Sequence, residues 1–467
     1  MDRIADPARD AARRRPHRPA VIDVIHDRRQ TWHELDDGIT ALTEKLNRAG
    51  VGAGDRVGMS LTPGSGFVET FHAIRRRGAI AVPLNPEAPT ADRREKLRYV
   101  DARLIITEPE SAPPEGETIS AIRWSPDESA TGADTERPPL HLQSADPACI
   151  LFTSGTTGKP KAVCHTNGSL HASALASAVR LGHSPADRWL VPLPPHHMGG
   201  LAPLTRTALY GTTVIYRSFS VAGIARSLEE HDPSMLSIVP VMLRRLLDAD
   251  VPLERLRVVL VGGDRTPPRL VERSLEQHVP VHVTYGMTET ASQIATATPA
   301  DLRENPTTVG PPLPWTDISI REAGEIVVSG PMVARGYWGE DGRFDDCYRT
   351  GDVGEIDRDG RLFVKGRLDD RIVSGGVTVD PERVLAKLKT HPDVKDGIVL
   401  GIEDDRWGER VAALLETPSG KELSEEELLR EVPREEQPRQ IAFTDCLPRT
   451  PSGTVARATV RARLERS

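Results

Sequence analysis

The sequence has few cysteines and no long hydrophobic run. The four cysteines lie far apart without a Cys-x-x-Cys pair, so neither a zinc site nor a disulfide framework is indicated; they are Cys149, Cys164, Cys347 and Cys446. The N-terminal segment has arginines but no apolar signal core, and no later segment approaches the ~20 apolar residues of a membrane span. We therefore expect a protein of the reducing cytoplasm with no membrane partner.

The sequence also lacks an excess of positive charge. The formal net charge at pH 7 is −8, which argues against nucleic acid or an anionic membrane as a partner, because either would require a concentrated basic surface. The ligand is therefore expected to be small. A chain of 467 residues with 38% apolar content can bury two or three domain cores. The oligomeric state stays open, with a homodimer as one option.

Short apolar runs alternate with helical patterns from residue 20 to 110, which predicts a parallel sheet built from βαβ units. Residues 109–139 are rich in Pro, Glu, Gly and Ser and are interpreted as a surface excursion, because "ACILFTSG" at once resumes a buried strand. Similar strands continue to about residue 286, which indicates one large α/β unit with helices flanking its sheets.

The pattern changes after "ISIREAGEIVVSG", which ends at residue 330. Short alternating strands with Asp-Gly turns, as in "GEIDRDGRLFVKGR", predict a small antiparallel, barrel-like element. A compact α+β segment follows from Asp369. We therefore predict a large N-terminal domain over residues 1–368 and a small mobile domain over residues 369–467.

One glycine-rich loop, "SGTTGKPK", follows the strand that ends at "LFT". Glycines let backbone N–H groups converge on a polyphosphate, hydroxyls add donors, and lysine neutralises charge. The Walker A pattern does not fit, because Thr153 stands where its first glycine belongs and Pro160 where Ser or Thr would bind magnesium. Taken alone, the loop could also be a polar surface turn.

Four further motifs accompany this loop in the chain: "TYGMTET", "YRTGD", "KGRLDDRIVSGG" and "GAIAVPLNP". Together they resemble the adenylate-forming superfamily, which includes acyl-CoA ligases, peptide adenylation domains and luciferases. The resemblance covers essentially the whole chain. It implies ATP and coenzyme A as co-substrates, Mg²⁺ as cofactor and a carboxylic acid as the acyl substrate.

The resemblance also implies roles for individual residues. Lys159, Lys161 and Thr288 would be catalytic, Glu289 would be catalytic and hold magnesium, and Asp369 would be the hinge. Asp352 would bind the ribose hydroxyls and Arg367 would lie near the ribose. The remaining ATP or AMP contacts would come from Thr153, Ser154, Gly155, Thr156, Thr157, Gly158, Gly262, Gly263, Tyr285 and Gly286, with Thr288 contacting the α-phosphate.

Each role has its own physical reason. A carboxylate can accept two hydrogen bonds from a ribose cis-diol, and a glutamate beside phosphates suits magnesium as a hard oxygen ligand. Taken singly, Asp352 could be a turn residue, Glu289 a helix N-terminal carboxylate and Arg367 a solvated residue. Adenylate formation needs positioning and charge neutralisation rather than a nucleophilic side chain.

The acyl substrate is suggested by three segments. No aspartate between Pro194 and Tyr210 could hold a substrate amine, so an amino acid is disfavoured. "PHHMGG" resembles the acyl-CoA ligase segment that places His197 at the acyl pocket, with His196 as a substrate contact or a polar filler. "TASQ", with Ser292 and Gln293, and the arginine Arg206 resemble the 2-succinylbenzoate–CoA ligases of menaquinone synthesis, whose substrate carries a second carboxylate. Another aryl- or fatty-acyl-CoA ligase is the alternative.

One position departs from the superfamily pattern. Its C-terminal motif ends P-R-T-x-S-G-K, whereas "LPRTPSGTVAR" has Thr454 where the lysine belongs. Losing a charged donor to a transition state typically costs ~10²–10³ in rate. The sequence therefore leaves two classes open: an active ligase in which another cation, such as Arg449 or Arg457, replaces the lysine, and a non-catalytic acyl-adenylate-binding protein.

Overall fold

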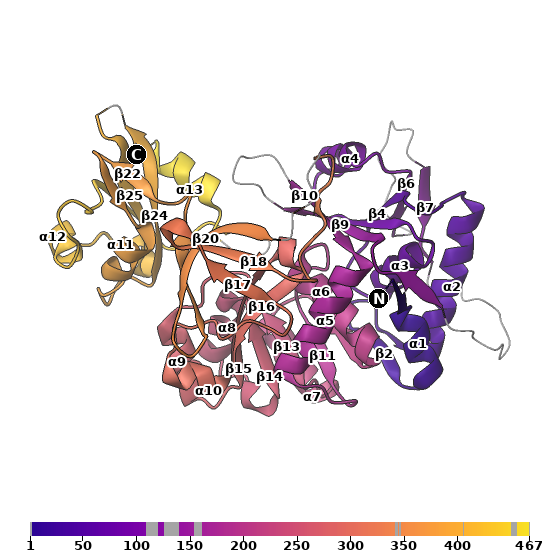
Figure 1. Ribbon diagram of the computed structural model, residues 1–467. Helices are drawn as coiled ribbons and strands as arrows, with labels where there is room; N and C mark the ends of the chain where they lie inside the picture. Colours follow the sequence, from indigo (N-terminus) through magenta and orange to yellow (C-terminus); the bar gives the residue numbers. More distant parts are fainter. Residues whose placement is uncertain are drawn as a thin grey trace. The chain divides into compact units, whose positions relative to one another are not determined.

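The computed structural model describes residues 2–108, 120–125, 140–153, 161–340, 344, 347–404, 406–449 and 455–466 (Figure 1). The chain divides into two compact units. The first consists of Met1–Ile318 and Val328–Tyr348, and the second of Ser319–Val327 and Arg349–Ser467. Among the described residues, no helix has both the length and the apolar character needed to cross a membrane.

One sheet of the first unit carries the start of the glycine-rich loop. Its seven strands run in the order β19-β10-β9-β5-β4-β6-β7. They are β4 (Arg56–Ser60), β5 (Ile80–Pro83), β6 (Leu104–Thr107), β7 (Ser120–Arg123), β9 (Pro147–Thr153), β10 (Lys161–Thr166) and β19 (Gly336–Tyr337). The strands are parallel from β9 to β7, whereas β10 pairs antiparallel with both β9 and β19.

A second sheet of eight strands has the order β16-β15-β14-β13-β11-β12-β2-β3. They are β2 (Pro19–Asp23), β3 (Arg28–Thr31), β11 (Arg188–Val191), β12 (Thr213–Tyr216), β13 (Met235–Ile238), β14 (Val258–Val261), β15 (Val281–Met287) and β16 (Ser292–Ala297). The six inner strands are parallel, and β3 and β16 form antiparallel edges. The strand predicted near residue 20 thus joins β12, rather than opening a single βαβ series with β4.

Ten helices accompany these sheets in the described part of the first unit. They are α1 (Pro7–Arg14), α2 (Trp32–Arg48), α3 (Ser65–Arg76), α4 (Thr90–Tyr99), α5 (Asn167–Leu181), α6 (Met198–Tyr210), α7 (Val221–Glu230), α8 (Pro240–Asp248), α9 (Pro268–Glu276) and α10 (Pro299–Glu304). Local sequence fixes several ends. Thr31 and Glu34 form a capping box at the start of α2, and Gly211 ends α6 in the left-handed conformation that glycine adopts without strain.

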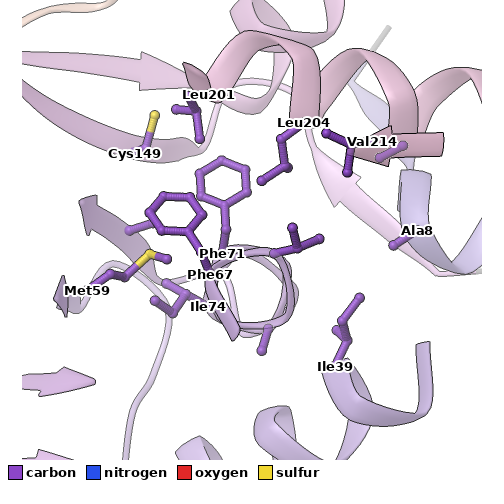
Figure 2. Packing of buried hydrophobic residues seen from close by; sticks show 14 of the residues in the cluster. Ala8, Ile39, Met59, Phe67, Phe71, Ile74, Cys149, Leu201, Leu204 and Val214 are labelled. Atoms are coloured by element: carbon purple, nitrogen blue, oxygen red, sulfur yellow. The ribbon is translucent and has the colours of Figure 1, made fainter. Parts of the chain in front are cut away.

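The core holds helix α6 in place. Figure 2 shows Phe67 and Phe71 of α3 pointing toward the cluster that contains Leu201 and Leu204 of α6. All four side chains are buried, and each such side chain contributes about 1.5–3 kcal/mol of burial free energy. This packing fixes the helix that carries Arg206.

The second unit contains most of a four-stranded sheet, with strands β17 (Asp317–Ile320), β18 (Glu325–Ser329), β20 (Tyr348–Ile356) and β21 (Leu362–Arg367) in that order. A further sheet has the order β23-β22-β25-β24, with β26 beside β25. Its strands are β22 (Ile372–Ser374), β23 (Val377–Val379), β24 (Asp396–Asp404), β25 (Gly408–Glu416) and β26 (Gln440–Thr444); the helices are α11 (Pro381–Leu388), α12 (Glu425–Leu429) and α13 (Arg457–Leu464).

This architecture confirms the predicted fold class: parallel sheets with flanking helices, a small antiparallel element and an α+β C-terminal part. The compact units group the small sheet with the C-terminal residues. The predicted division into a domain of residues 1–368 and a mobile domain of residues 369–467 stays a prediction.

Candidate active site

The glycine-rich loop is anchored by two paired strands. Thr153 ends β9 and Lys161 begins β10, and the two residues lie opposite each other in the antiparallel register. The intervening residues Ser154, Gly155, Thr156, Thr157, Gly158 and Lys159 lie outside the described part of the chain, so their phosphate-binding roles stay predictions. The anchoring strands are those of the first unit's seven-stranded sheet, with β9 in the interior.

The "TYGMTET" segment leaves β15 through a sharp turn. Strand β15 ends at Met287, and a single 3₁₀ turn, η2 (Thr288–Thr290), leads through Ala291 into β16. A β-bulge falls between Tyr285 and Gly286. A Cβ atom on Gly286 would lie 1.5 Å from the carbonyl oxygen of Ser292, so no other residue fits without moving the backbone.

A buried histidine connects this turn to the strand that follows the glycine-rich loop. His165 of β10 has its Nε2 2.6 Å from the carbonyl oxygen of Thr288 and its Nδ1 3.0 Å from the Ser169 hydroxyl. Burial lowers the pKa of His165 to about 4. The ring is therefore neutral at pH 7 and donates its Nε2–H to the carbonyl, which fixes the backbone of the predicted α-phosphate contact.

Glu289 lies in the same turn and is held by a tyrosine. Its side chain is almost fully buried, and the Tyr337 hydroxyl donates to its Oε1 at 3.0 Å. The Lys161 ammonium nitrogen lies 4.9 Å from the centre of the Tyr337 ring. Burial, with a further contribution from Glu289, raises the pKa of Tyr337 to about 12, so the phenol keeps its proton at neutral pH.

Two glycines follow the neighbouring strand β14. A Cβ on Gly262 would lie 2.7 Å from Cγ2 of Thr284, and Gly263 has a φ of +82°. Both observations require glycine here: the first because of a close approach to β15, the second because other residues rarely adopt this conformation. They give a turn at the carboxyl end of a parallel strand, which is where α/β sheets bind ligands.

Helix α6 follows the histidine pair, with His197 at its N-cap, and carries the predicted pocket arginine. The rings of His196 and His197 lie 4.4 Å apart, and burial lowers the pKa of both, that of His196 to about 3. Arg206 is 1% exposed, with its guanidinium carbon 5.4 Å from the centre of the Trp189 ring. Neither Nε nor Nη2 of Arg206 has a hydrogen-bond partner among the described residues.

An unpartnered guanidinium in the interior is unusual, because burying a charge without a counter-ion is costly. Burial lowers the pKa of Arg206 to about 10, so the group stays charged at pH 7. Its free N–H groups are suited to an anionic oxygen that the protein itself does not supply.

The two polar residues after the turn differ from each other. Gln293 is fully buried: its Oε1 accepts from Ser177 at 2.7 Å and its Nε2 donates to Thr296 at 2.8 Å. Ser292 has a φ of +96°, a conformation that L-residues rarely adopt. The amide of Gln293 thus links α5 to β16, and its contact with the acyl group stays a prediction.

The second unit contains the predicted ribose residues. Asp352 and Arg367 lie opposite each other in the β20–β21 pair, with Oδ1 and Nη1 3.6 Å apart. The backbone N–H of Asp352 donates to the Thr350 hydroxyl, which in turn donates to the Ile326 carbonyl. Asp369 lies in the turn that follows β21.

Thr454 lies outside the described residues, but its two basic neighbours are placed. Arg449 pairs with Asp396 at 2.9 Å, and the same carboxylate also binds Lys389. Arg457 is half-exposed and pairs with Asp370 at 2.8 Å, next to the predicted hinge residue. Both arginines are therefore engaged within the second unit.

Sequence reasoning missed Tyr337 and His165. Tyr337 comes from "ARGYW", and only its position opposite Val163 on β10 brings it to Lys161 and Glu289. His165 stands in an apolar strand, "KAVCHT", where a lone histidine carries no signal of what it contacts.

Comparison with known proteins places this arrangement in a family. Residues 8–338 match the AMP-binding enzyme family, and residues 386–454 match the AMP-binding enzyme C-terminal domain. The chain belongs to the AMP-binding enzyme family.

Individual relatives are similar over nearly the whole chain. The 2-succinylbenzoate–CoA ligase of Bacillus pumilus (strain SAFR-032) is 35% identical, covering 95% of this chain and 94% of the relative. The o-succinylbenzoate CoA synthetase (MenE) from Bacillus subtilis in complex with the acyl-adenylate intermediate OSB-AMP has a TM-score of 0.89 at 31% identity, covering 99% of both chains. The same enzyme in complex with ATP and a magnesium ion has a TM-score of 0.88 at 31% identity, covering 99% of this chain and 100% of that one.

Proposed function

We propose that this protein is an ATP-dependent acid–CoA ligase. Its acyl substrate would be 2-succinylbenzoate, the acid that is joined to coenzyme A in menaquinone synthesis. Relatives with that activity match nearly the whole chain. The choice of this acid rests on Arg206, whose buried guanidinium has N–H groups without a hydrogen-bond partner among the described residues. A dicarboxylate leaves one carboxylate for this cation while the other reacts.

The reaction has two steps. First, a carboxylate oxygen of the acid attacks the α-phosphorus of ATP, the bond from that phosphorus to the bridging oxygen breaks, and pyrophosphate leaves. Then the thiolate of coenzyme A attacks the acyl carbonyl, the acyl–phosphate bond breaks, and AMP leaves. Both steps need alignment and charge stabilisation more than a protein nucleophile.

Residues of the first unit would stabilise the phosphates. Lys161, with Lys159 and the rest of the glycine-rich loop, would neutralise the β- and γ-phosphates, and the Thr288 hydroxyl would donate to the α-phosphate. Support comes from the His165–Thr288 hydrogen bond, which fixes the turn, and from Thr153 and Lys161 facing each other at the base of the loop.

Glu289 fits a magnesium ligand. Mg²⁺ is usually held by one or two carboxylates together with substrate phosphates and water. Tyr337 hydrogen-bonds Oε1 of Glu289, and no group of the described residues bonds Oε2. No cluster of three or more His, Cys, Asp or Glu side chains suited to a metal occurs in the described part of the chain, which agrees with a site completed by ATP. When bound, the ion would neutralise phosphate charge and favour departure of pyrophosphate.

Several of the predicted residues would contact the nucleoside. Asp352 would accept hydrogen bonds from the two ribose hydroxyls, with Arg367 beside it, as their 3.6 Å contact on adjacent strands supports. Gly262, Gly263, Tyr285 and Gly286 would let the adenosine approach the backbone at the carboxyl ends of β14 and β15. Asp369 would be the hinge about which residues 369–467 turn between the two steps.

The acyl group would lie near α6. Arg206 would bind the carboxylate on the aromatic ring while the succinyl carboxylate reacts, and neutral His197 would line the pocket. Ser292 and Gln293 would shape the opposite wall, Gln293 through the hydrogen bonds that hold it in place. A cytoplasmic location would give the enzyme ATP and coenzyme A. A homodimer stays a prediction.

The test is a panel of acids. Purified protein is incubated with ATP, Mg²⁺ and coenzyme A, and both pyrophosphate and acyl-CoA are measured. We expect 2-succinylbenzoate to exceed benzoate and medium-chain fatty acids by at least tenfold in kcat/KM. A preference for a monocarboxylic acid would show that the protein is another kind of acyl-CoA ligase.

Thr454 motivates the second candidate, a binder of acyl-adenylate that does not make it. At an enzyme concentration equal to that of ATP, even a slow ligase releases one equivalent of pyrophosphate. Release of none, combined with tight binding of a stable acyl-adenylate analogue, would establish the binder instead.

A further inference from the structure

Tyr337 contacts two charged groups that belong to different motifs. Its hydroxyl donates to Oε1 of Glu289 at 3.0 Å, and its ring centre lies 4.9 Å from Nζ of Lys161. The Tyr348 hydroxyl lies 3.3 Å from that of Tyr337. All these residues belong to the first unit. One side chain therefore touches both the magnesium carboxylate and the lysine at the base of the glycine-rich loop.

Three backbone contacts fix the position of this tyrosine. Tyr337 pairs with Val163 on β10, and the next residue, Trp338, donates its N–H to the carbonyl of Ala162 at 2.7 Å. Three residues before Tyr337, the N–H of Ala334 donates to the backbone carbonyl of Glu289 at 2.8 Å. The ring is thus held against β10 and against the turn of Glu289 before any ligand arrives.

The register explains the contact with lysine. Lys161 and Val163 point to the same face of β10 because side chains alternate along a strand. Tyr337 lies opposite Val163, so Lys161 is its diagonal neighbour, within reach of a long side chain. An ammonium group over an aromatic face is stabilised by the ring quadrupole.

The arrangement also keeps two opposite charges apart. No ion pair joins Lys161 to Glu289, although both touch Tyr337. A direct pair would neutralise both groups and withdraw them from phosphate and metal. The phenol instead gives each a neutral partner: the carboxylate has a hydroxyl donor on one oxygen, and the ammonium has the ring face.

We propose that Tyr337 is a positioning residue for adenylate formation, which orients Glu289 for magnesium through its hydroxyl and holds Lys161 for the ATP phosphates through its ring. The inference rests on the proposed function. The two halves of the side chain have separable tasks, because the hydroxyl acts on the metal ligand and the ring acts on the lysine.

Two substitutions separate these tasks. Tyr337→Phe keeps the ring and removes the hydroxyl, whereas Tyr337→Leu removes both. The matched control is Tyr99→Phe, which deletes a hydroxyl that donates to the Trp338 carbonyl, next to Tyr337 but not in contact with Glu289. Each variant is checked by thermal unfolding, and each is titrated with Mn²⁺ and ATP, without acid or coenzyme A, by electron paramagnetic resonance.

We expect Tyr337→Phe to weaken Mn²⁺ binding in the presence of ATP by about 10-fold, the usual effect of losing the partner that orients a metal ligand. Its affinity for metal-free ATP should stay native. Tyr337→Leu should weaken Mn²⁺ equally and also metal-free ATP by about 3-fold, as expected for loss of a cation–π contact. In a Glu289→Gln background, Tyr337→Phe should have no further effect on Mn²⁺.

Native Mn²⁺ binding in Tyr337→Phe, or a loss of equal size in the Tyr99→Phe control, would overturn the proposal. So would an additive effect of Tyr337→Phe in the Glu289→Gln background, since a purely structural role would persist there. The binding assay contains no acid, so it stays informative if 2-succinylbenzoate is the wrong substrate. Conversely, if the wild-type protein forms no acyl-CoA, the proposed function is wrong, but the Mn²⁺ and ATP titrations still test the role of Tyr337.

Discussion

Nε2 of His165 lies 2.6 Å from the carbonyl oxygen of Thr288, which joins the strand after the glycine-rich loop to the turn that carries Glu289. Neither residue has a neighbour in sequence that would suggest this bond. The ring is buried and must stay neutral to fit. The two segments that are predicted to bind phosphate are therefore linked through a titratable side chain.

The first prediction concerns pH. Burial lowers the pKa of His165 to about 4 and that of His72 to about 3, below the 6.5 of an unfolded chain. Between these values the unfolded state binds more protons. The free energy of unfolding is therefore intact above pH 6.5 and falls with decreasing pH, by up to about 1.4 kcal/mol per pH unit for each histidine.

Urea unfolding at several values between pH 7 and pH 5 measures this slope. Replacing His72 with glutamine should reduce the slope relative to wild type, whatever the absolute change in stability. An identical slope in wild type and in the His72→Gln variant would contradict the assignment.

The second prediction separates stability from function at Arg206. Arg206→Met replaces a buried, partly unpaired cation with an apolar side chain, so the free energy of unfolding should stay level or rise. At the same time, kcat/KM for 2-succinylbenzoate should fall by about 10²–10³, because the carboxylate loses its charged partner. 4-Oxo-4-phenylbutanoate, which keeps the succinyl chain but lacks the carboxylate on the ring, should react equally with both proteins. An equal decrease in kcat/KM for both acids would mean that Arg206 has a structural role and does not bind the second carboxylate.

The third prediction tests the turn before Thr288. Gly286→Ala would place a Cβ 1.5 Å from the Ser292 carbonyl oxygen, so the turn must move, and we expect a loss of about 2–3 kcal/mol with strongly reduced adenylation. Gly52→Ala is the control, since its Cβ would meet nothing closer than 3.9 Å. Calorimetric unfolding and pyrophosphate release, measured on both variants, decide the outcome. Native stability in Gly286→Ala would mean that the bulge can relax.

The fourth prediction restores the missing lysine. Thr454→Lys should speed the first half-reaction several-fold, because a positioned cation stabilises charge that develops in the transition state. Thr454→Met, similar in length but uncharged, is the matched control. Rapid-quench measurement of acyl-adenylate in a single turnover isolates this step from product release. Equal rates for the lysine variant and wild type would show that another group already supplies the charge.

Much of the fold could be predicted because its elements carry local signals. The runs "RVGMSL" and "LRVVLVGG" became β4 and β14, and "GFVETFHAIRRRG" became α3, as the alternation of apolar runs and helical patterns indicated. The sheet to which a strand belongs is not a local property. Strand β2 pairs with β12, far along the chain, and nothing in "AVIDVI" specifies that partner.

Candidate site residues can be proposed from the sequence where a residue type and its motif suffice, as for Asp352 and Glu289, whose roles stay predictions. Arg206 gained support only from three-dimensional facts, its burial and its unpaired nitrogens. Tyr337 could not be found, because its two contacts come from β10 and from the turn after β15. Such a residue is defined by strand register, which short-range patterns do not encode.

The pairing of β2 with β12 also constrains how the protein is made. Strand β2 leaves the ribosome early, but its parallel partner begins only at Thr213. At about 5–20 residues per second, the nascent chain waits on the order of tens of seconds for that partner. During synthesis, Val21 and Ile22 can pair with β3 but lack their partners on β12, so one edge of β2 stays open until Thr213–Tyr216 has been made. Loop-closure entropy makes such distant pairing slow, and the N-terminal strand should be among the last to acquire protection from hydrogen exchange.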